Sequence, residues 1–124
     1  SKKGFGEAVG LIYGAKYIKN QADYYFKISG RYYLNDDFEI NDFLDSNFAF
    51  LKYDRSISTR LYGFSQSVFN VWYRALWLSL LFLYFTIMSI EFVLPKFIKQ
   101  KYVKSLNRLG ISGFIAPGGE YIKE

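Results

Sequence analysis

The chain has 124 residues, a length that accommodates one domain with a proper core but not two. Hydrophobic residues make up 51 % of the sequence, aromatic residues 22 %, and the formal net charge is +5. Cys and His are both absent, which excludes disulfides, thiolate nucleophiles, imidazole bases and the usual zinc and haem ligands. The composition therefore predicts a protein that is not an enzyme and that uses no cofactor and no metal.

The first predicted element is a helix over residues 6–28, because apolar side chains recur along it at three- to four-residue spacing. Gly6, Gly10 and Gly14 lie on one side of that helix. Since glycine lowers helix stability, three glycines in register favour a face on which another helix packs closely. A flexible N-terminus is the alternative. The dinucleotide fingerprint G-x-G-x-x-G fails here, because Val9 stands where its third glycine is required and no strand precedes it.

The aromatic segment 24–34 allows two interpretations. It ends the helix, with Gly30 just past the last turn, or it forms a short hairpin that turns at Ser29 and Gly30. We favour the helix end. The acidic stretch 36–45 that follows lacks the glycine and the final carboxylate of a calcium loop. A solvated acidic loop that faces a basic partner is therefore the preferred interpretation.

The longest apolar run covers residues 75–95, in which twelve residues are Leu, Ile, Phe or Val. As a helix this run measures about 31 Å, which matches the hydrocarbon thickness of a bilayer. Trp72, Tyr73 and Trp77 cluster at its first end, as expected of residues at the membrane interface, and Glu91 lies near its other end. The pattern predicts a transmembrane helix. The alternative is the central helix of a soluble protein, apolar all round.

Beyond Pro95, apolar residues follow one helical face up to Gly110, which supplies a stop signal. The other faces carry basic residues, which predicts an amphipathic helix on anionic lipid headgroups and places the C-terminus on the matrix or cytoplasmic side. These predicted headgroup ligands are Lys96, Lys99, Lys101, Lys104 and Arg108. The sequence thus predicts a mainly α fold with a membrane-peripheral segment 1–64, a transmembrane helix 65–95, and an amphipathic helix with a C-terminal tail 96–124.

In this layout the chain resembles the small single-span accessory subunits of mitochondrial inner-membrane complexes, and residues 10–17 (GLIYGAKY) are similar to the glycine-motif helix of the ATP synthase subunit e family. The resemblance implies a non-catalytic structural subunit of the respiratory chain or ATP synthase. Its partners would be other subunits and anionic phospholipid, not nucleic acid. Two alternatives stay open: a membrane-tethered adaptor that recruits soluble partners, and a contribution to an ion or proton pathway through Glu91.

Overall fold

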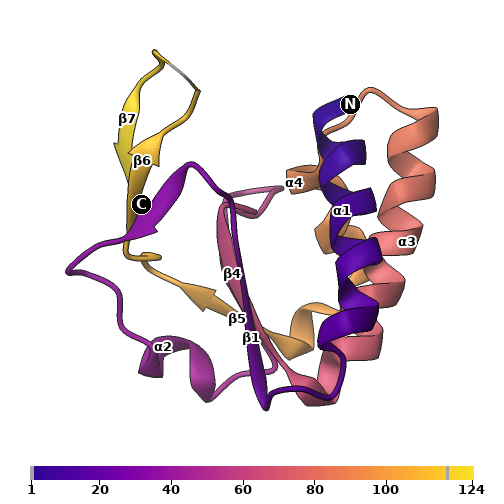
Figure 1. Cartoon of the computed structure of the whole chain (residues 1–124), viewed down its shortest axis with the longest axis horizontal. Helices are drawn as coiled ribbons and strands as arrows, with labels where there is room; N and C mark the ends of the chain where they lie inside the picture. Colours follow the sequence, from indigo (N-terminus) through magenta and orange to yellow (C-terminus); the bar gives the residue numbers. More distant parts are fainter. Residues whose placement is uncertain (1, 117) are drawn as a thin grey trace.

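The computed structural model describes residues 2–116 and 118–124, which form two β-sheets beside a layer of helices (Figure 1). In chain order the elements are α1 (Lys2–Ile18), β1 (Tyr24–Ile28), β2 (Tyr32–Leu34), α2 (Asn41–Leu44), β3 (Phe48–Leu51), β4 (Leu61–Ser65), the 3-10 turn η1 (Gln66–Val68), α3 (Phe69–Phe85), α4 (Ile90–Val93), the 3-10 turns η2 (Leu94–Phe97) and η3 (Gln100–Tyr102), β5 (Val103–Leu106), β6 (Ile111–Phe114) and β7 (Tyr121–Lys123). Helices hold 42 % of the chain and strands 25 %. The mainly α fold predicted from the sequence is therefore wrong, and the fold is α/β.

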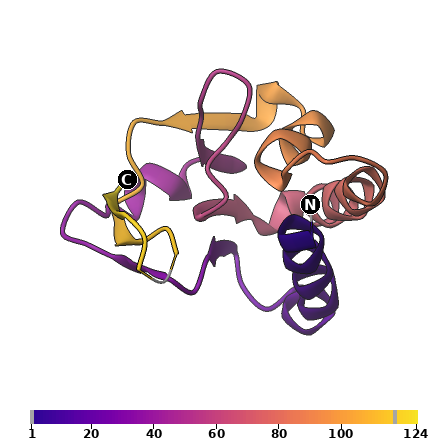
Figure 2. The same ribbon diagram turned by 90° about the horizontal axis from the view of Figure 1, so that it is seen from above.

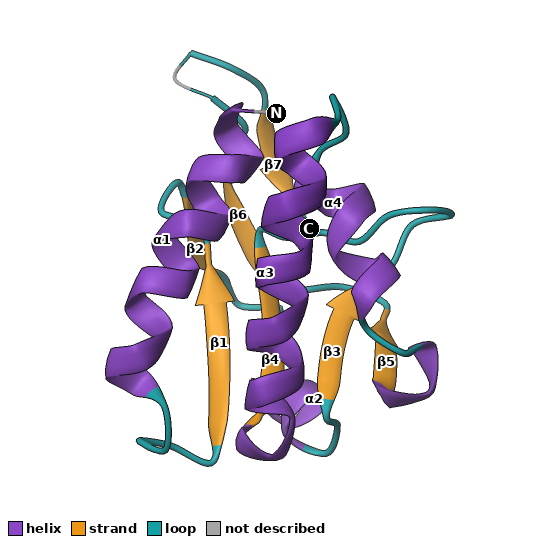
Figure 3. Ribbon diagram, turned by 90° about the vertical axis from the view of Figure 1, so that its right-hand side faces the viewer, coloured by secondary structure: helices purple, strands orange, loops and turns teal. Residues whose placement is uncertain are grey.

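The larger sheet has the strand order β1-β4-β3-β5, and the smaller sheet has the order β2-β6-β7. Strands β1 and β3 run antiparallel to β4, while β5 runs parallel to β3. Helices α1, α3 and α4 cover one face of the larger sheet (Figure 3), and α2 and the smaller sheet lie on its other side (Figure 1; Figure 2). Because β3 pairs with β5 and β2 with β6, strands from residues 1–64 and from residues 96–124 share both sheets.

The core has one apolar cluster on each face of the larger sheet. Successive side chains of a strand point to opposite faces. In β4, Tyr62 and Phe64 accordingly join the cluster under the helices, whereas Leu61 joins the cluster on the other face. Trp72 of α3 stacks on Phe64 with the ring centroids 4.4 Å apart and 25° between the ring planes. This stack fixes α3 against the centre of the sheet.

The helix predicted over residues 6–28 ends at Ile18, where α1 stops. Asn20 then adopts a φ of 63°, the left-handed conformation that commonly terminates helices. The hydroxyl of Tyr25 accepts hydrogen bonds from the backbone N–H groups of Gln21 and Ala22 and donates one to the carbonyl of Ile18 at 2.7 Å. These three bonds hold the link between α1 and β1.

The aromatic segment 24–34 forms two strands, in agreement with neither sequence interpretation in full. The hairpin alternative is right that both arms are extended and that the chain turns between them, where Tyr32 donates its N–H to the carbonyl of Ser29 at 3.1 Å. The arms do not pair with each other, because β1 pairs with β4 and β2 with β6. The segment therefore links the two sheets.

The apolar run 75–95 is not one continuous helix. Helix α3 ends at Phe85, the chain turns over residues 86–89, and α4 and η2 return to the core, where Val93 and Leu94 are fully buried. Pro95 has no N–H to give to the carbonyl of Glu91, and Ile57 donates to that carbonyl instead at 3.0 Å. Among the described residues, Gln66–Phe85 is the one helical segment long and apolar enough to cross a membrane, and 39 % of its apolar window is buried within the chain.

The basic amphipathic helix predicted after Pro95 is also wrong. Two 3-10 turns and the strands β5 and β6 occupy residues 96–114. Leu106 and Leu109, which the helical pattern places on one face, are both buried in the cluster beneath the larger sheet. Gly110 has a φ of 82°, and a Cβ at this position would lie 2.3 Å from the Cα of Phe38. Only glycine, which has no Cβ and tolerates a positive φ, allows the backbone at position 110 to pass this close to Phe38.

Candidate functional site

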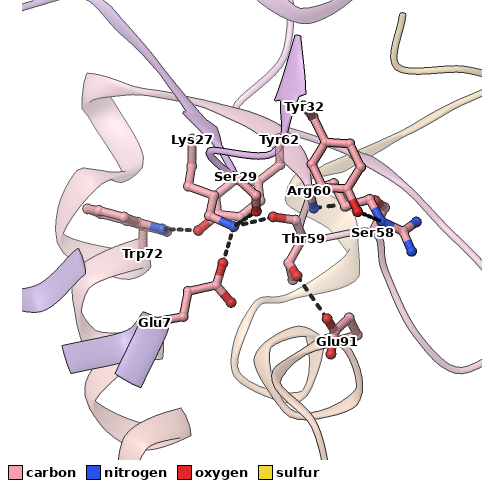
Figure 4. Close-up of polar contacts among 10 residues, drawn as sticks. All are labelled: Glu7, Lys27, Ser29, Tyr32, Ser58, Thr59, Arg60, Tyr62, Trp72 and Glu91. Carbon is pink, nitrogen blue, oxygen red and sulfur yellow. Dashed lines mark hydrogen bonds and ion pairs between the residues drawn. The ribbon is translucent and has the colours of Figure 1, made fainter. Parts of the chain in front are cut away.

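A pocket of about 490 Å³ lies between α1, the turn after β1, the segment just before β4, and α4. We call it the polar pocket. Its charged and hydroxyl-bearing lining residues are Glu7, Lys27, Ser29, Arg31, Tyr32, Thr59, Arg60 and Glu91, most of which appear in Figure 4. The volume falls within the range of about 300 to 1,000 Å³ that is typical of small-molecule sites.

Lys27 lines the polar pocket and is only 8 % exposed. The alternation of β1 places it on the same face as Tyr25, beneath α1. Its Nζ donates to Oε1 of Glu7, to the backbone carbonyl of Thr59 and to Oγ of Ser29, the last at 2.9 Å (Figure 4). A buried ammonium needs such partners to offset its lost hydration. Lys27 is thus an internal cation that joins α1 to β1 and to the segment just before β4.

Tyr62 and Trp72 lie in the core beside Lys27 and do not line the polar pocket. The Trp72 indole N–H donates to the Tyr62 hydroxyl at 3.0 Å, and Nζ of Lys27 lies 5.8 Å from the centre of the Tyr62 ring. Burial raises the pKa of the Tyr62 hydroxyl above its usual value, and the nearby Glu7 carboxylate adds to the effect. Tyr62 therefore stays neutral at physiological pH and serves as a hydrogen-bond acceptor for Trp72.

The other side of the polar pocket comes from residues 59–60, just before β4, and from α4. Thr59 donates its hydroxyl to Oε1 of Glu91 at 3.2 Å. Arg60 forms an ion pair with Glu124 at 2.9 Å and donates from Nε to the Tyr32 hydroxyl at 3.1 Å. The predicted ion-pathway residue Glu91 is thus part of a pocket wall, half-buried and bonded to a neutral donor.

The glycine side of α1 faces the polar pocket and not α3. Gly6 and Gly10 line the pocket, and beyond the adjoining backbone of α1 no described atom lies within 4 Å of the position that a Cβ would take at Gly6, Gly10 or Gly14. The contact with α3 uses the opposite side of α1, which carries the buried Ala8 and Ala15. Close packing of another helix on the glycine side therefore stays a prediction about a partner molecule.

A second candidate site is an apolar surface at the C-terminal end of α3 and in the turn that follows. We call it the apolar cap; it consists of Phe5, Trp77, Leu81, Tyr84, Phe85 and Ile87. The exposed fraction rises along the chain, from 45 % for Trp77 to 56 % for Leu81, 71 % for Tyr84, 79 % for Phe85 and 98 % for Ile87. Phe5 at the start of α1 lies against Tyr84, with the ring centroids 6.2 Å apart. Large apolar side chains in this number are not expected to face water without a purpose.

The three residues predicted at the membrane interface have different environments. Trp77 belongs to the apolar cap. Tyr73 is half-buried and lines a small groove with Lys16 and Lys19 at the opposite end of α3. Trp72 is 2 % exposed and stacks in the core, so its side chain cannot reach lipid in this fold.

The five predicted headgroup residues do not share one helical face. Lys96, Lys99 and Lys101 are exposed on and between the two 3-10 turns. The other two bind the acidic loop: Lys104 pairs with Asp45 at 3.0 Å and Arg108 with Asp37 at 3.7 Å. The basic partner expected for the acidic loop is therefore supplied, at least in these pairs, by the C-terminal third of the same chain.

The sequence did not single out Lys27, Thr59 or Arg60 as site residues. The available signal was the alternation of β1, in which Lys27 occupies a position on the buried face with Tyr25. Pairing of Lys27 with Tyr62 across β1 and β4 then brings Thr59 and Arg60 to the pocket. Comparison of the chain with protein-family models, curated proteins and solved structures found no significant match.

Proposed function

We propose that this chain is a non-catalytic module that attaches to a membrane surface through the apolar cap and serves there as an accessory subunit of a larger complex. The observation that supports the proposal most is the rise in exposure from Trp77 to Ile87. Each large apolar side chain moved out of water contributes about 1.5 to 3 kcal/mol. A hydrocarbon environment therefore stabilises the surface that water disfavours.

The dimensions of the apolar cap suit insertion into one leaflet. From Trp77 to Phe85 the helix rises about 12 Å, less than half of a hydrocarbon core that is about 30 Å thick. The chain then turns at 86–89 and returns to the protein core, so the cap ends in a loop tip and not in a span. Attachment of this kind is monotopic, with the protein resting on one side of the bilayer.

The polar end of α3 suits the headgroup region. Asn70 and Arg74 are exposed on α3 before the cap begins, and Lys16 of α1 and Lys19, just after α1, lie beside that end of the helix. Basic side chains near an anionic surface contribute about 1 kcal/mol each. The order of an apolar tip, then Trp77, then basic residues follows the order of hydrocarbon, interface and headgroup in a leaflet.

Vesicle flotation tests the proposal. Phe85→Ser/Ile87→Ser should lower the partition constant onto anionic phospholipid vesicles by at least tenfold, because two exposed side chains contribute more than about 1.4 kcal/mol together. Ile40→Ser/Leu44→Ser is the control, since both are exposed apolar side chains, at 47 % and 46 %, that lie outside the apolar cap. Equal flotation of the two double variants would contradict the proposal, and so would a stable dimer of the wild-type chain that does not bind vesicles.

The finer parts of the sequence-derived function remain predictions. These are residence in the mitochondrial inner membrane, membership of the respiratory chain or ATP synthase, and contacts with other subunits and anionic phospholipid. The adaptor alternative shares the membrane contact and differs in its partners. Comigration with a large complex after mild-detergent extraction favours the subunit, whereas a small free species favours the adaptor.

A further inference from the structure

We infer that the polar pocket binds a small zwitterion, a molecule that carries an ammonium group and an anionic group. The inference starts from the charges that line the pocket. Lys27 is neutralised by Glu7, and Arg60 is neutralised by Glu124. Apart from the residues in these two pairs, the charged residues that line the pocket are one carboxylate, Glu91, and one guanidinium, Arg31.

These two charges are uncompensated within the part of the chain that the structure describes. Glu91 accepts a hydrogen bond from the uncharged Thr59 hydroxyl, and the guanidinium of Arg31 has no ion pair or hydrogen bond to a described residue. They come from different elements, α4 and the turn after β1. A ligand that satisfies both presents a cationic group to Glu91 and an anionic group to Arg31, and hydrogen bonds to charged groups are the strong ones.

The shape of the pocket agrees with a small polar ligand. Its wall on α1 is formed in part by Gly6 and Gly10, where nothing described fills the space of a missing side chain. Glycine within a helix lowers stability by about 1 kcal/mol relative to alanine. The open volume at Gly6 and Gly10 therefore comes at the expense of helix stability. The charged lining disfavours an apolar helix as occupant, because burial of Glu91 and Arg31 against hydrocarbon side chains would leave both charges unpaired.

Two sources supply the same chemistry. One is a soluble metabolite such as O-phosphoethanolamine, and the other is the head of a phosphatidylethanolamine lipid, in which the same ammonium group is joined to a phosphodiester. Glu91 lies four residues after Ile87, so α4 connects the polar pocket to the apolar cap. The inference itself does not depend on membrane attachment, because the soluble ligand tests the pocket without a bilayer.

The experiment titrates the full chain with O-phosphoethanolamine and follows binding by NMR chemical shifts and calorimetry. Glu91→Gln and Arg31→Gln should each weaken binding about tenfold, since each removes one charge-assisted interaction. Asp54→Asn and Arg55→Gln, two exposed residues outside the pocket, are the matched controls and should bind as the wild type does. Circular dichroism verifies that all four variants remain folded.

Further arms separate the outcomes. Ethanolamine alone and inorganic phosphate alone should each bind at least tenfold more weakly than the zwitterion. Displacement of the soluble ligand by phosphatidylethanolamine vesicles, but not by phosphatidylcholine vesicles, identifies the lipid headgroup as the source. No displacement by either vesicle identifies a soluble ligand, and both results agree with the inference. Absence of saturable binding, undiminished binding by Glu91→Gln, or phosphate that binds as tightly as the zwitterion would overturn it.

Discussion

Trp72 donates its indole N–H to the hydroxyl of Tyr62 at 3.0 Å inside the core between α3 and β4. Tyr62→Phe removes the acceptor and leaves a buried N–H unsatisfied. We expect a loss of about 1 to 3 kcal/mol in the free energy of unfolding, measured by urea denaturation. Tyr17→Phe, which changes an exposed tyrosine, should stay within about 0.5 kcal/mol of the wild type. Equal stability of the two variants would show that this bond contributes nothing.

The protein should lose stability at alkaline pH. Burial, followed by the Glu124 carboxylate, raises the pKa of Tyr53 from 10.0 to about 12, and burial also raises the pKa of Tyr62. Above pH 10 the unfolded chain therefore loses tyrosine protons that the native state keeps. The unfolded state then binds fewer protons, so the free energy of unfolding falls as the pH rises from 10 towards 12.

Denaturation curves at pH 8, 10 and 11 test this dependence. The double variant Tyr53→Phe/Tyr62→Phe should show a shallower decline than the wild type, although it starts from a lower stability. Parallel declines would rule out the two tyrosines as the cause.

The buried ion pair between Lys27 and Glu7 should be sensitive to removal of one partner. Lys27→Met leaves the Glu7 carboxylate and the Thr59 carbonyl without their shared donor, and we expect a loss of about 3 kcal/mol. Lys27→Met/Glu7→Leu should recover the part of that loss that comes from the unpaired Glu7 carboxylate, because it leaves an apolar pair and no buried charge. Lys104→Met breaks an exposed pair with Asp45 and should cost about 1 kcal/mol or less. A double variant as unstable as Lys27→Met would contradict this account.

Two glycines should respond to alanine in opposite directions. Gly10→Ala adds a methyl group to open space within a helix, and we expect a gain of up to about 1 kcal/mol. Gly110→Ala forces a Cβ onto the backbone of Phe38 at a φ of 82°, and we expect a loss of more than about 2 kcal/mol. Thermal denaturation of both variants measures these two changes in stability. A loss of stability in Gly10→Ala would mean that the glycine side of α1 is packed and not open.

The sequence predicted the helical nature of α1 and α3 but not the strands around them. In β4 four successive residues are buried, because helices cover one face of the sheet and the second cluster covers the other. A strand buried on both faces lacks the alternation of polar and apolar residues that marks a half-exposed strand. Aromatic residues in β1 also fit helical spacing, so periodicity alone favoured one long helix over residues 6–28.

The apolar run 75–95 misled the sequence analysis for a different reason. It combines three surfaces: the side of α3 in the core, the exposed apolar cap, and the buried Val93 and Leu94 after the turn. The mean hydropathy of the run adds the residues of all three surfaces together, so it does not reveal the turn at 86–89. The polar pocket was beyond prediction because Lys27 and Thr59 meet only through the pairing of β1 with β4.

The most direct test of membrane attachment uses the absence of Cys from the sequence, which makes a single introduced thiol unique. Ile87→Cys and, as the control on α2, Leu44→Cys are each labelled with the environment-sensitive fluorophore NBD and mixed with anionic vesicles. The label at position 87 should brighten and shift to the blue as it enters hydrocarbon, while the label at position 44 should not change. An unchanged spectrum at position 87, or equal changes at both positions, would contradict insertion of the apolar cap.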